Sequence, residues 1–130
     1  MGVKTESARL HDCGFNCAQS VLCSNREYTG IDDSKALALA GGFGGGVRCG
    51  EICGALSGAV MAVGCANPYN DAEDTEAKEK IAELAVRCTS EFKEKFNNVR
   101  CQDLKNAGHS CDELITYAAE MAEKIIQENK

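Results

Sequence analysis

Apolar residues recur every three or four positions along much of this chain, which is the spacing of an amphipathic helix. The clearest stretch covers about residues 72–97, with apolar positions Ala77, Ile81, Leu84, Ala85, Cys88, Phe92 and Phe96. A second stripe follows Ser110 and consists of Cys111, Leu114, Ile115, Ala118, Met121, Ala122 and Ile125. We therefore predict two long helices, each with one buried face.

A third segment, from about Gly50 to Cys65, is apolar on nearly all sides. A helix with that pattern is usually buried all round, so we predict that this helix is central. Gly50, Gly54 and Gly58 repeat every four residues and would leave one flat face. Small residues allow another backbone to come close, either within the chain or across a homodimer interface.

Capping signals place the remaining helices. Three pairs fit the capping box, in which a polar residue is followed three positions later by Glu or Gln: Asn16 with Gln19, Asn70 with Glu73, and Ser110 with Glu113. The first pair predicts a helix that runs to about Ser24, and the other two open the long helices. Shorter elements are predicted before Gly14, from Asp32 or Asp33 to Ala40, and as a turn or short helix over 101–104.

The same pattern predicts the fold class. No segment alternates apolar and polar residues in the manner of a strand, and no repeat or low-complexity linker divides the chain. A length of 130 residues suits one domain. We predict a single all-α domain over residues 1–130, an irregular bundle of about five helices around the buried Gly- and Ala-rich helix.

The charge balance excludes two classes of partner. The chain carries 14 Lys and Arg against 20 Asp and Glu, for a net charge of −6, with no basic cluster. We therefore expect it to bind neither nucleic acid nor an anionic membrane surface. The first 14 residues contain no apolar stretch typical of a signal peptide, and the longest apolar segment, residues 52–66, is too short to cross a bilayer comfortably. We expect a cytoplasmic protein with reduced cysteines.

Nine cysteines are the most informative feature of the composition, and an odd number cannot be paired completely within one chain. Cys13 with Cys17 and Cys49 with Cys53 are spaced C-x3-C, and the absence of C-x2-C argues against a zinc ribbon or a thioredoxin motif. Residues four apart on a regular helix keep their Cβ atoms about 5–6 Å apart. A disulfide needs about 3.8 Å, so a bond within either pair is disfavoured.

Two cysteines directly follow predicted helix caps, because Cys17 comes after Asn16 and Cys111 after Ser110. The free backbone N–H groups and the dipole at the start of a helix stabilise an anion. We therefore expect a lowered pKa for both thiols. Since a thiolate is both a nucleophile and a metal ligand, this expectation leaves thiol chemistry and metal binding open.

The cysteines also carry a resemblance to a known family. Residues 53–58 read CGALSG and match a CGAxxG element, and the stretch GGFGGGVRCGEICGALSG over residues 41–58 resembles the Gly-rich approach to it. Cys17 precedes this element, and Cys101 and Cys111 follow it. Over about residues 14–125, the chain resembles a family of redox-active proteins with the cysteine pattern C…CGAxxG…C…C, the C_GCAxxG_C_C family.

The resemblance implies a small redox protein whose working part is formed by Cys17, Cys53, Cys101 and Cys111. In one mechanism the four thiolates hold a [2Fe–2S] cluster or another metal, and the protein carries electrons. In the other, an oxidoreductase cycles these cysteines between dithiol and disulfide, with a redox partner protein or a small thiol. The alternative is a module without redox function, either with structural zinc on the same cysteines or as a plain helical interaction module.

Other residues are weaker candidates. Cys49 is a candidate auxiliary ligand or redox residue, and Cys13 is a weaker one that is somewhat better explained without a function. His109 is a candidate ligand or proton shuttle, although we predict that both His109 and His11 are exposed loop residues. Three cysteines within predicted helices are assigned to the core: Cys23, Cys65 and Cys88. The GGFGGG loop over residues 41–46 fits neither nucleotide-binding motif and is predicted to be a turn.

Overall fold

The computed structural model describes residues 2–130 and confirms an all-α domain in that range. Its helices are α1 (Val3–Asp12), α2 (Cys17–Ser24), α3 (Arg26–Thr29), α4 (Asp33–Ala40), α5 (Gly54–Ala66), α6 (Thr75–Phe96), α7 (Cys101–Asn106) and α8 (Cys111–Glu128). A tight turn, η1, covers Gly46–Gly50. An isolated antiparallel bridge between Ile52 and Arg100 is the one sheet-like pairing in the described residues.

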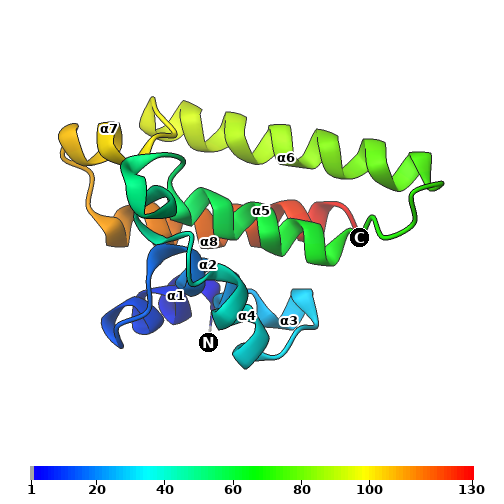
Figure 1. The fold of residues 1–130 in the computed structure, drawn as a ribbon, viewed down its shortest axis with the longest axis horizontal. Coiled ribbons are helices and arrows are strands. Elements are labelled where there is room, and N and C mark those ends of the chain that lie inside the picture. Colours follow the sequence, from blue (N-terminus) through cyan, green and yellow to red (C-terminus); the bar gives the residue numbers. More distant parts are fainter. Residues whose placement is uncertain (1) are drawn as a thin grey trace.

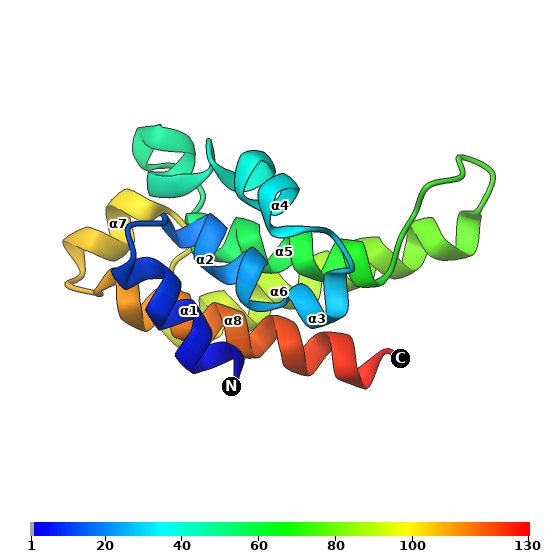
Figure 2. The ribbon, with the colours of Figure 1, turned by 90° about the horizontal axis from the view of Figure 1, so that it is seen from below.

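Helix α5 lies in the middle of the bundle (Figure 1). The long helix α6 runs along one side of it, and α2 and α8 pack on its other sides (Figures 1 and 2). Helix α1 packs against both α2 and α8. The core between these helices is built from large apolar side chains that are fully buried, among them Leu22, Val63, Phe92, Leu104, Ile115 and Ile125.

The central position of α5 confirms the prediction, but its burial is incomplete. Ala55, Ala59 and Val63 are buried, whereas Val60 and Met61 are partly exposed along a groove. A pattern of apolar residues on all sides therefore did not distinguish a covered face from an open one. In residues 2–130, no helix combines the length and the hydropathy that a membrane crossing requires.

The start of α5 corrects the predicted boundary, because the helix begins at Gly54 and not at Gly50. Neither Glu51 (ψ −141°) nor Cys53 (ψ 130°) has a helical ψ angle. Gly50 has a φ of 77° and follows a left-handed run over residues 45–48. A right-handed helix cannot pass through such a left-handed segment. Gly54 and Gly58 face α2, since a Cβ on Gly58 would lie 2.7 Å from the Ala18 carbonyl oxygen. This part of the flat face therefore packs within the chain.

Two of the three predicted caps are confirmed. Asn16 forms a complete capping box with Gln19, and the Ser110 hydroxyl accepts a hydrogen bond from the Glu113 amide at 3.2 Å. The prediction for Asn70 is wrong, because Asp74 caps α6 by accepting a hydrogen bond from the Ala77 amide at 3.0 Å. Helix α6 therefore begins three residues later than predicted and buries the apolar stripe at Leu84, Cys88, Phe92 and Phe96.

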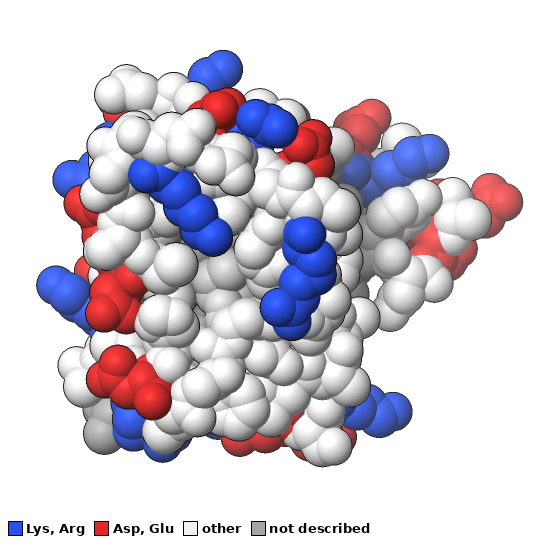
Figure 3. Space-filling view, turned by 60° about the vertical axis from the view of Figure 1, so that its left-hand side comes forward, with Lys and Arg blue, Asp and Glu red and all other residues white. Residues whose placement is uncertain are grey.

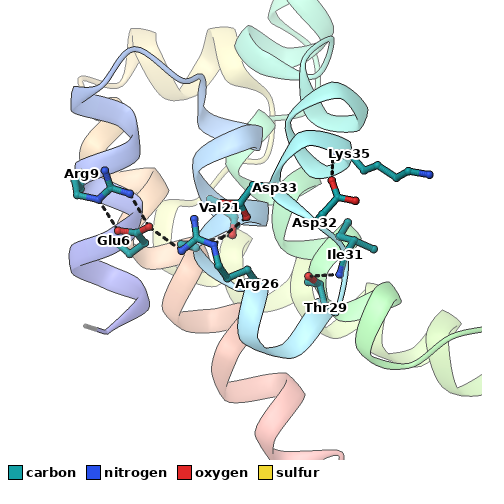
Figure 4. A network of polar contacts seen from close by, with 10 residues as sticks. Glu6, Arg9, Val21, Arg26, Thr29, Ile31, Asp32, Asp33 and Lys35 are labelled. Atoms are coloured by element: carbon teal, nitrogen blue, oxygen red, sulfur yellow. Dashed lines mark hydrogen bonds and ion pairs between the residues drawn. The ribbon is translucent and has the colours of Figure 1, made fainter.

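A charged network joins the N-terminal helices on the side away from α6 (Figure 4). The Glu6 carboxylate accepts hydrogen bonds from Arg9 at 2.7 and 2.8 Å and from Arg26 at 2.8 Å. Arg26 also pairs with Asp33 at 3.0 Å, so the network connects α1 with α3 and α4. The bonds from Arg9, and then those from Arg26, lower the pKa of Glu6 to about 2 although burial opposes them.

Candidate functional site

Four cysteines from four parts of the chain surround one cavity of about 140 Å³. They are Cys17, Cys53, Cys101 and Cys111, the four that the sequence singled out. The cavity is completed by His11, Asn16, Gly45, Lys105 and Leu114. The cysteines in the described residues are all free thiols, so no pair around the cavity is closed as a disulfide.

Each of the four cysteines stands at the start of a helix. Cys17, Cys101 and Cys111 are the first residues of α2, α7 and α8, and Cys53 directly precedes α5. The first turn of a helix has backbone N–H groups without helical partners and carries a partial positive charge. The convergence of four such helix starts therefore polarises the cavity in the sense that stabilises negative charge.

Backbone hydrogen bonds place Cys53 beside Cys101. The Cys53 amide donates to the Val99 carbonyl at 2.8 Å, and the Cys101 amide donates to the Glu51 carbonyl at 2.6 Å. These two bonds flank the Ile52–Arg100 bridge and join the segments that lead into α5 and α7. The chain thus fixes two cavity cysteines through its backbone before any side chain contributes.

Hydrogen bonds of Asn16 at the start of α2 fix the position of Cys17. Its Oδ1 accepts a hydrogen bond from the backbone N–H of Gln19 at 2.9 Å, and its own backbone N–H donates to Gln19 Oε1 at 3.0 Å. Its Nδ2 donates to the Gly41 carbonyl at 3.0 Å. The cap of α2 therefore also ties the Gly-rich segment to the rim of the cavity.

Two glycines have no side chain because cysteines occupy that space. A Cβ on Gly54 would lie 2.5 Å from Cys17 Sγ and 2.7 Å from the Phe43 carbonyl oxygen. A Cβ on Gly46 would lie 2.5 Å from the backbone N and O of Glu51 and 2.8 Å from Cys101 Cβ, so both the backbone and a cysteine fill that space. In the CGAxxG element, the first Gly thus admits the Cys17 sulfur, and the second, Gly58, admits the backbone of α2.

The thiols of Cys53 and Cys111 are neutral at neutral pH. Burial raises the pKa of Cys53 to about 11, although the backbone amides of Leu56 and Ala55 oppose the increase. Cys111 is exposed overall, but partial desolvation of its thiol and then the charge of Cys17 raise its pKa, with Lys105 acting in the opposite direction. The lowered pKa that we predicted for Cys111 is therefore wrong, because the loss of hydration outweighs the position at the start of a helix.

The donor set suits a metal centre, but the sulfur atoms are spread out. In residues 2–130, no three cysteine sulfurs lie within 4.8 Å of one another. A single tetrahedral zinc ion with Zn–S bonds of about 2.3 Å would bring its sulfurs to about 3.8 Å. The sulfurs of these free thiols are therefore not arranged as a single tetrahedral zinc ion would hold them.

The sequence profile of a family described as "Putative redox-active protein (C_GCAxxG_C_C)" matches residues 15–125. The chain belongs to this family. The matched range includes all four cavity cysteines, so the family's pattern coincides with one place in the fold. No protein with a curated description and no solved structure matches this C_GCAxxG_C_C protein.

Two further cysteines of this C_GCAxxG_C_C protein lie outside the group that lines the cavity. Cys49 is exposed within η1, and Cys13 is exposed after α1, with its sulfur 3.9 Å from Arg9 Nη1. Of the three cysteines assigned to the core, Cys23 and Cys88 are buried and Cys65 is partly buried. The structure gives Cys49 and Cys13 no direct contact with the cavity.

His11, and not His109, lines the cavity. His109, the one we considered as a ligand, bonds to Glu113 at 2.9 Å and lies edge-on to Phe96, away from the cavity lining. His11 lines the cavity and bonds through Nδ1 to Asp112 at 2.8 Å. The prediction that both histidines are exposed loop residues is wrong for His11, which lies in α1 and is partly buried. The packing of α1 against α8 places His11 at the cavity, and α7 brings Lys105 there.

Proposed function

We propose that this family member is an electron carrier in which Cys17, Cys53, Cys101 and Cys111 hold an iron–sulfur cluster. The observation that carries the proposal is the convergence of four helix starts, each with one cysteine, on one cavity. Four cysteine thiolates are the common ligand set of such clusters, and a bound cluster supplies one-electron chemistry. The positive ends of the helices would stabilise the negative charge of the thiolates.

The size of the cavity supports an inorganic group. Pockets for organic ligands and cofactors measure about 300–1,000 Å³, whereas this cavity measures about 140 Å³. A nicotinamide or flavin ring with its attached chain therefore exceeds the space between the four cysteines.

The pKa directions favour ligation over thiol–disulfide exchange. A cysteine that attacks a disulfide near neutral pH needs an accessible thiolate. Cys53 is buried with a pKa of about 11, and the pKa of Cys111 is raised as well. A metal ion, in contrast, displaces the thiol protons when it binds and then compensates the charge.

The remaining residues of the site would orient the ligands and exclude water. Asn16 holds the first turn of α2, and the backbone bonds beside Ile52 and Arg100 hold Cys53 and Cys101. Buried side chains at Cys53, Cys101 and Leu114 close the inner end of the cavity. Leu114, one turn after Cys111, adds an apolar wall there.

The test is purification without oxygen, followed by absorption spectroscopy and determination of iron and acid-labile sulfide. We expect broad absorption at about 320–600 nm that bleaches on reduction, with iron and sulfide present together. Cys53→Ser should remove the absorption. Cys88→Ser is the matched control, because Cys88 is also buried with a pKa of about 11 but lies in α6, outside the cavity lining.

Two results would contradict the proposal. One is a colourless protein with stoichiometric zinc, which would assign a structural role to the same four cysteines. The other is a metal-free protein in which two of these thiols are lost as the protein releases two electrons and return when it is reduced. That result would assign a dithiol–disulfide couple.

A further inference from the structure

The cavity with the four cysteines has a single Lys or Arg among its lining residues, and this is Lys105. It lies on α7, four residues after Cys101, with an exposed side chain. In the described residues no carboxylate lies within ion-pair distance of its ammonium group. Its charge is therefore available to whatever approaches the cavity.

Lys105 has no ion-pair partner among the described residues, although carboxylates stand near the cavity. At the end of the molecule that carries α7, basic side chains stand on a broad uncharged area, with acidic side chains toward the edges (Figure 3). The lining residue His11 bonds to Asp112, whose side chain is 62% exposed, at 2.8 Å, and the Asp12 carboxylate lies close to both. In residues 2–130, Lys105 is the unpaired positive group at this cavity, on a chain whose net charge of −6 repels anions.

Lys105 acts on the cysteine that a reactant meets first. Of the four cavity cysteines, Cys111 is exposed, Cys17 is partly exposed, and Cys53 and Cys101 are buried. Cys111 and Lys105 both line the cavity. A molecule that approaches the cavity from solvent therefore meets Cys111 and the Lys105 ammonium together.

We propose that Lys105 makes the cavity mouth selective for anionic reactants, so that the redox partner of this site presents a carboxylate beside its reacting group. This inference rests on the proposed function for the role of the cavity, but the selection itself depends only on the folded chain. A neutral or cationic reactant of the same size gains nothing from Lys105. The carboxylate can belong to a small molecule or to an acidic segment of a protein.

The experiment compares two reagents that differ in charge, anionic iodoacetate and neutral iodoacetamide, on the full chain after reduction and removal of metal. Labelling rates are measured separately for each cysteine by peptide mass spectrometry. In Lys105→Gln, the ratio of iodoacetate to iodoacetamide rates at Cys111 should fall about fivefold, the effect of one exposed ion pair. In 1 M salt, the wild-type ratio should approach that of the variant, because the Debye length shrinks to about 3 Å.

Two controls show whether the effect of Lys105 on the labelling ratio is confined to the cavity. Cys49 is exposed outside the cavity, so its ratio in the same sample should not change in Lys105→Gln. Lys78→Gln removes an exposed lysine of α6 and should leave the Cys111 ratio unchanged. Far-UV circular dichroism establishes that each variant keeps its helices.

A further arm distinguishes the sources of the carboxylate. If a glutamate-rich peptide protects Cys111 from iodoacetamide in the wild type but not in Lys105→Gln, an acidic protein segment is the source. If the reagent ratio depends on Lys105 and the peptide gives no protection, a small molecule is the source. The same Cys111 ratio in wild type and Lys105→Gln, or an equal fall at Cys49, overturns the inference. The labelling experiment needs no iron. A protein that proves to contain no iron would therefore overturn the proposed iron–sulfur cluster without changing the outcome for Lys105.

Discussion

The charged network at Glu6 and the cavity at Cys53 both bury an acidic group, with opposite consequences. Glu6 is 9% exposed and has a pKa of about 2, whereas Cys53 is 2% exposed and has a pKa of about 11. Glu6 has Arg9 and Arg26 against its carboxylate. Cys53 is surrounded by other thiols and backbone amides, so desolvation dominates. Glu6 thus has its counter-ions within the chain, whereas Cys53 needs a cation from outside to be a thiolate.

The largest expected effect is the pH dependence of metal binding at the cavity. Because Cys53 and Cys111 are protonated well above neutral pH, a metal ion that binds both displaces at least two protons. Below their pKa values, affinity for a thiophilic ion should therefore rise about 100-fold per pH unit. Titration with Co²⁺ at pH 6.5 and 7.5, followed through its thiolate charge-transfer absorption, measures this change. Equal affinities at the two pH values would refute the neutral state of these thiols.

The next effect comes from the close approach of α5 to Cys17. Gly54→Ala should lower the free energy of unfolding by about 1–3 kcal/mol, because the new Cβ overlaps Cys17 Sγ and the Phe43 carbonyl oxygen. Gly64→Ala is the control on the same helix, since its Cβ meets only Ile81 Cδ1 at 3.9 Å. That variant should gain up to about 1 kcal/mol from helix propensity. Urea unfolding of both variants measures the difference, and similar values would disprove the tight contact.

The charged network should give a smaller loss with a defined pH range. Glu6→Gln should lower the free energy of unfolding by about 1–2 kcal/mol at pH 7, because water screens arginine side chains that are 51% and 37% exposed. Since folding lowers the pKa of Glu6 from 4.5 to about 2, this contribution is complete above pH 4.5 and is lost as the pH falls toward 2. Thermal unfolding at pH 7 and pH 2.5 measures it. A gap between wild type and variant that persists at pH 2.5 would contradict the assignment, and Glu83→Gln on α6 should show no gap at either pH.

The smallest expected effect concerns Asn16, which caps α2 and holds its first turn at the cavity. Asn16→Ala should cost about 1 kcal/mol through loss of the cap, and it should also speed the alkylation of Cys17 as the first turn of α2 loosens. Asp32→Ala removes the comparable cap of α4, where Asp32 accepts from the Lys35 amide at 2.9 Å. It should cost a similar amount without a change at Cys17. If both variants change Cys17 labelling equally, Asn16 has no special role at the cavity.

Local sequence signals predicted the start of a helix correctly where the predicted capping residue directly precedes that helix. Asn16 and Ser110 were read correctly because capping involves residues three positions apart. At Asn70 the signal failed because Asp74 supplied a competing cap for the same helix. The boundary at Gly50 failed because a right-handed helix and the left-handed segment before Gly54 contain similar small residues.

The sequence by itself determined the fold class and most helix boundaries, since these depend on local periodicity, and its resemblance to the family singled out the four cysteines that line one cavity. Only the tertiary structure decided that these cysteines share one cavity and that His11 and Lys105 join them while Cys49 and His109 do not. It also decided the pKa of Cys111, where burial outweighs the start of the helix. The reason is that hydration and distance between segments far apart in the chain arise only when helices pack. A helix cap, in contrast, is complete within four residues of sequence.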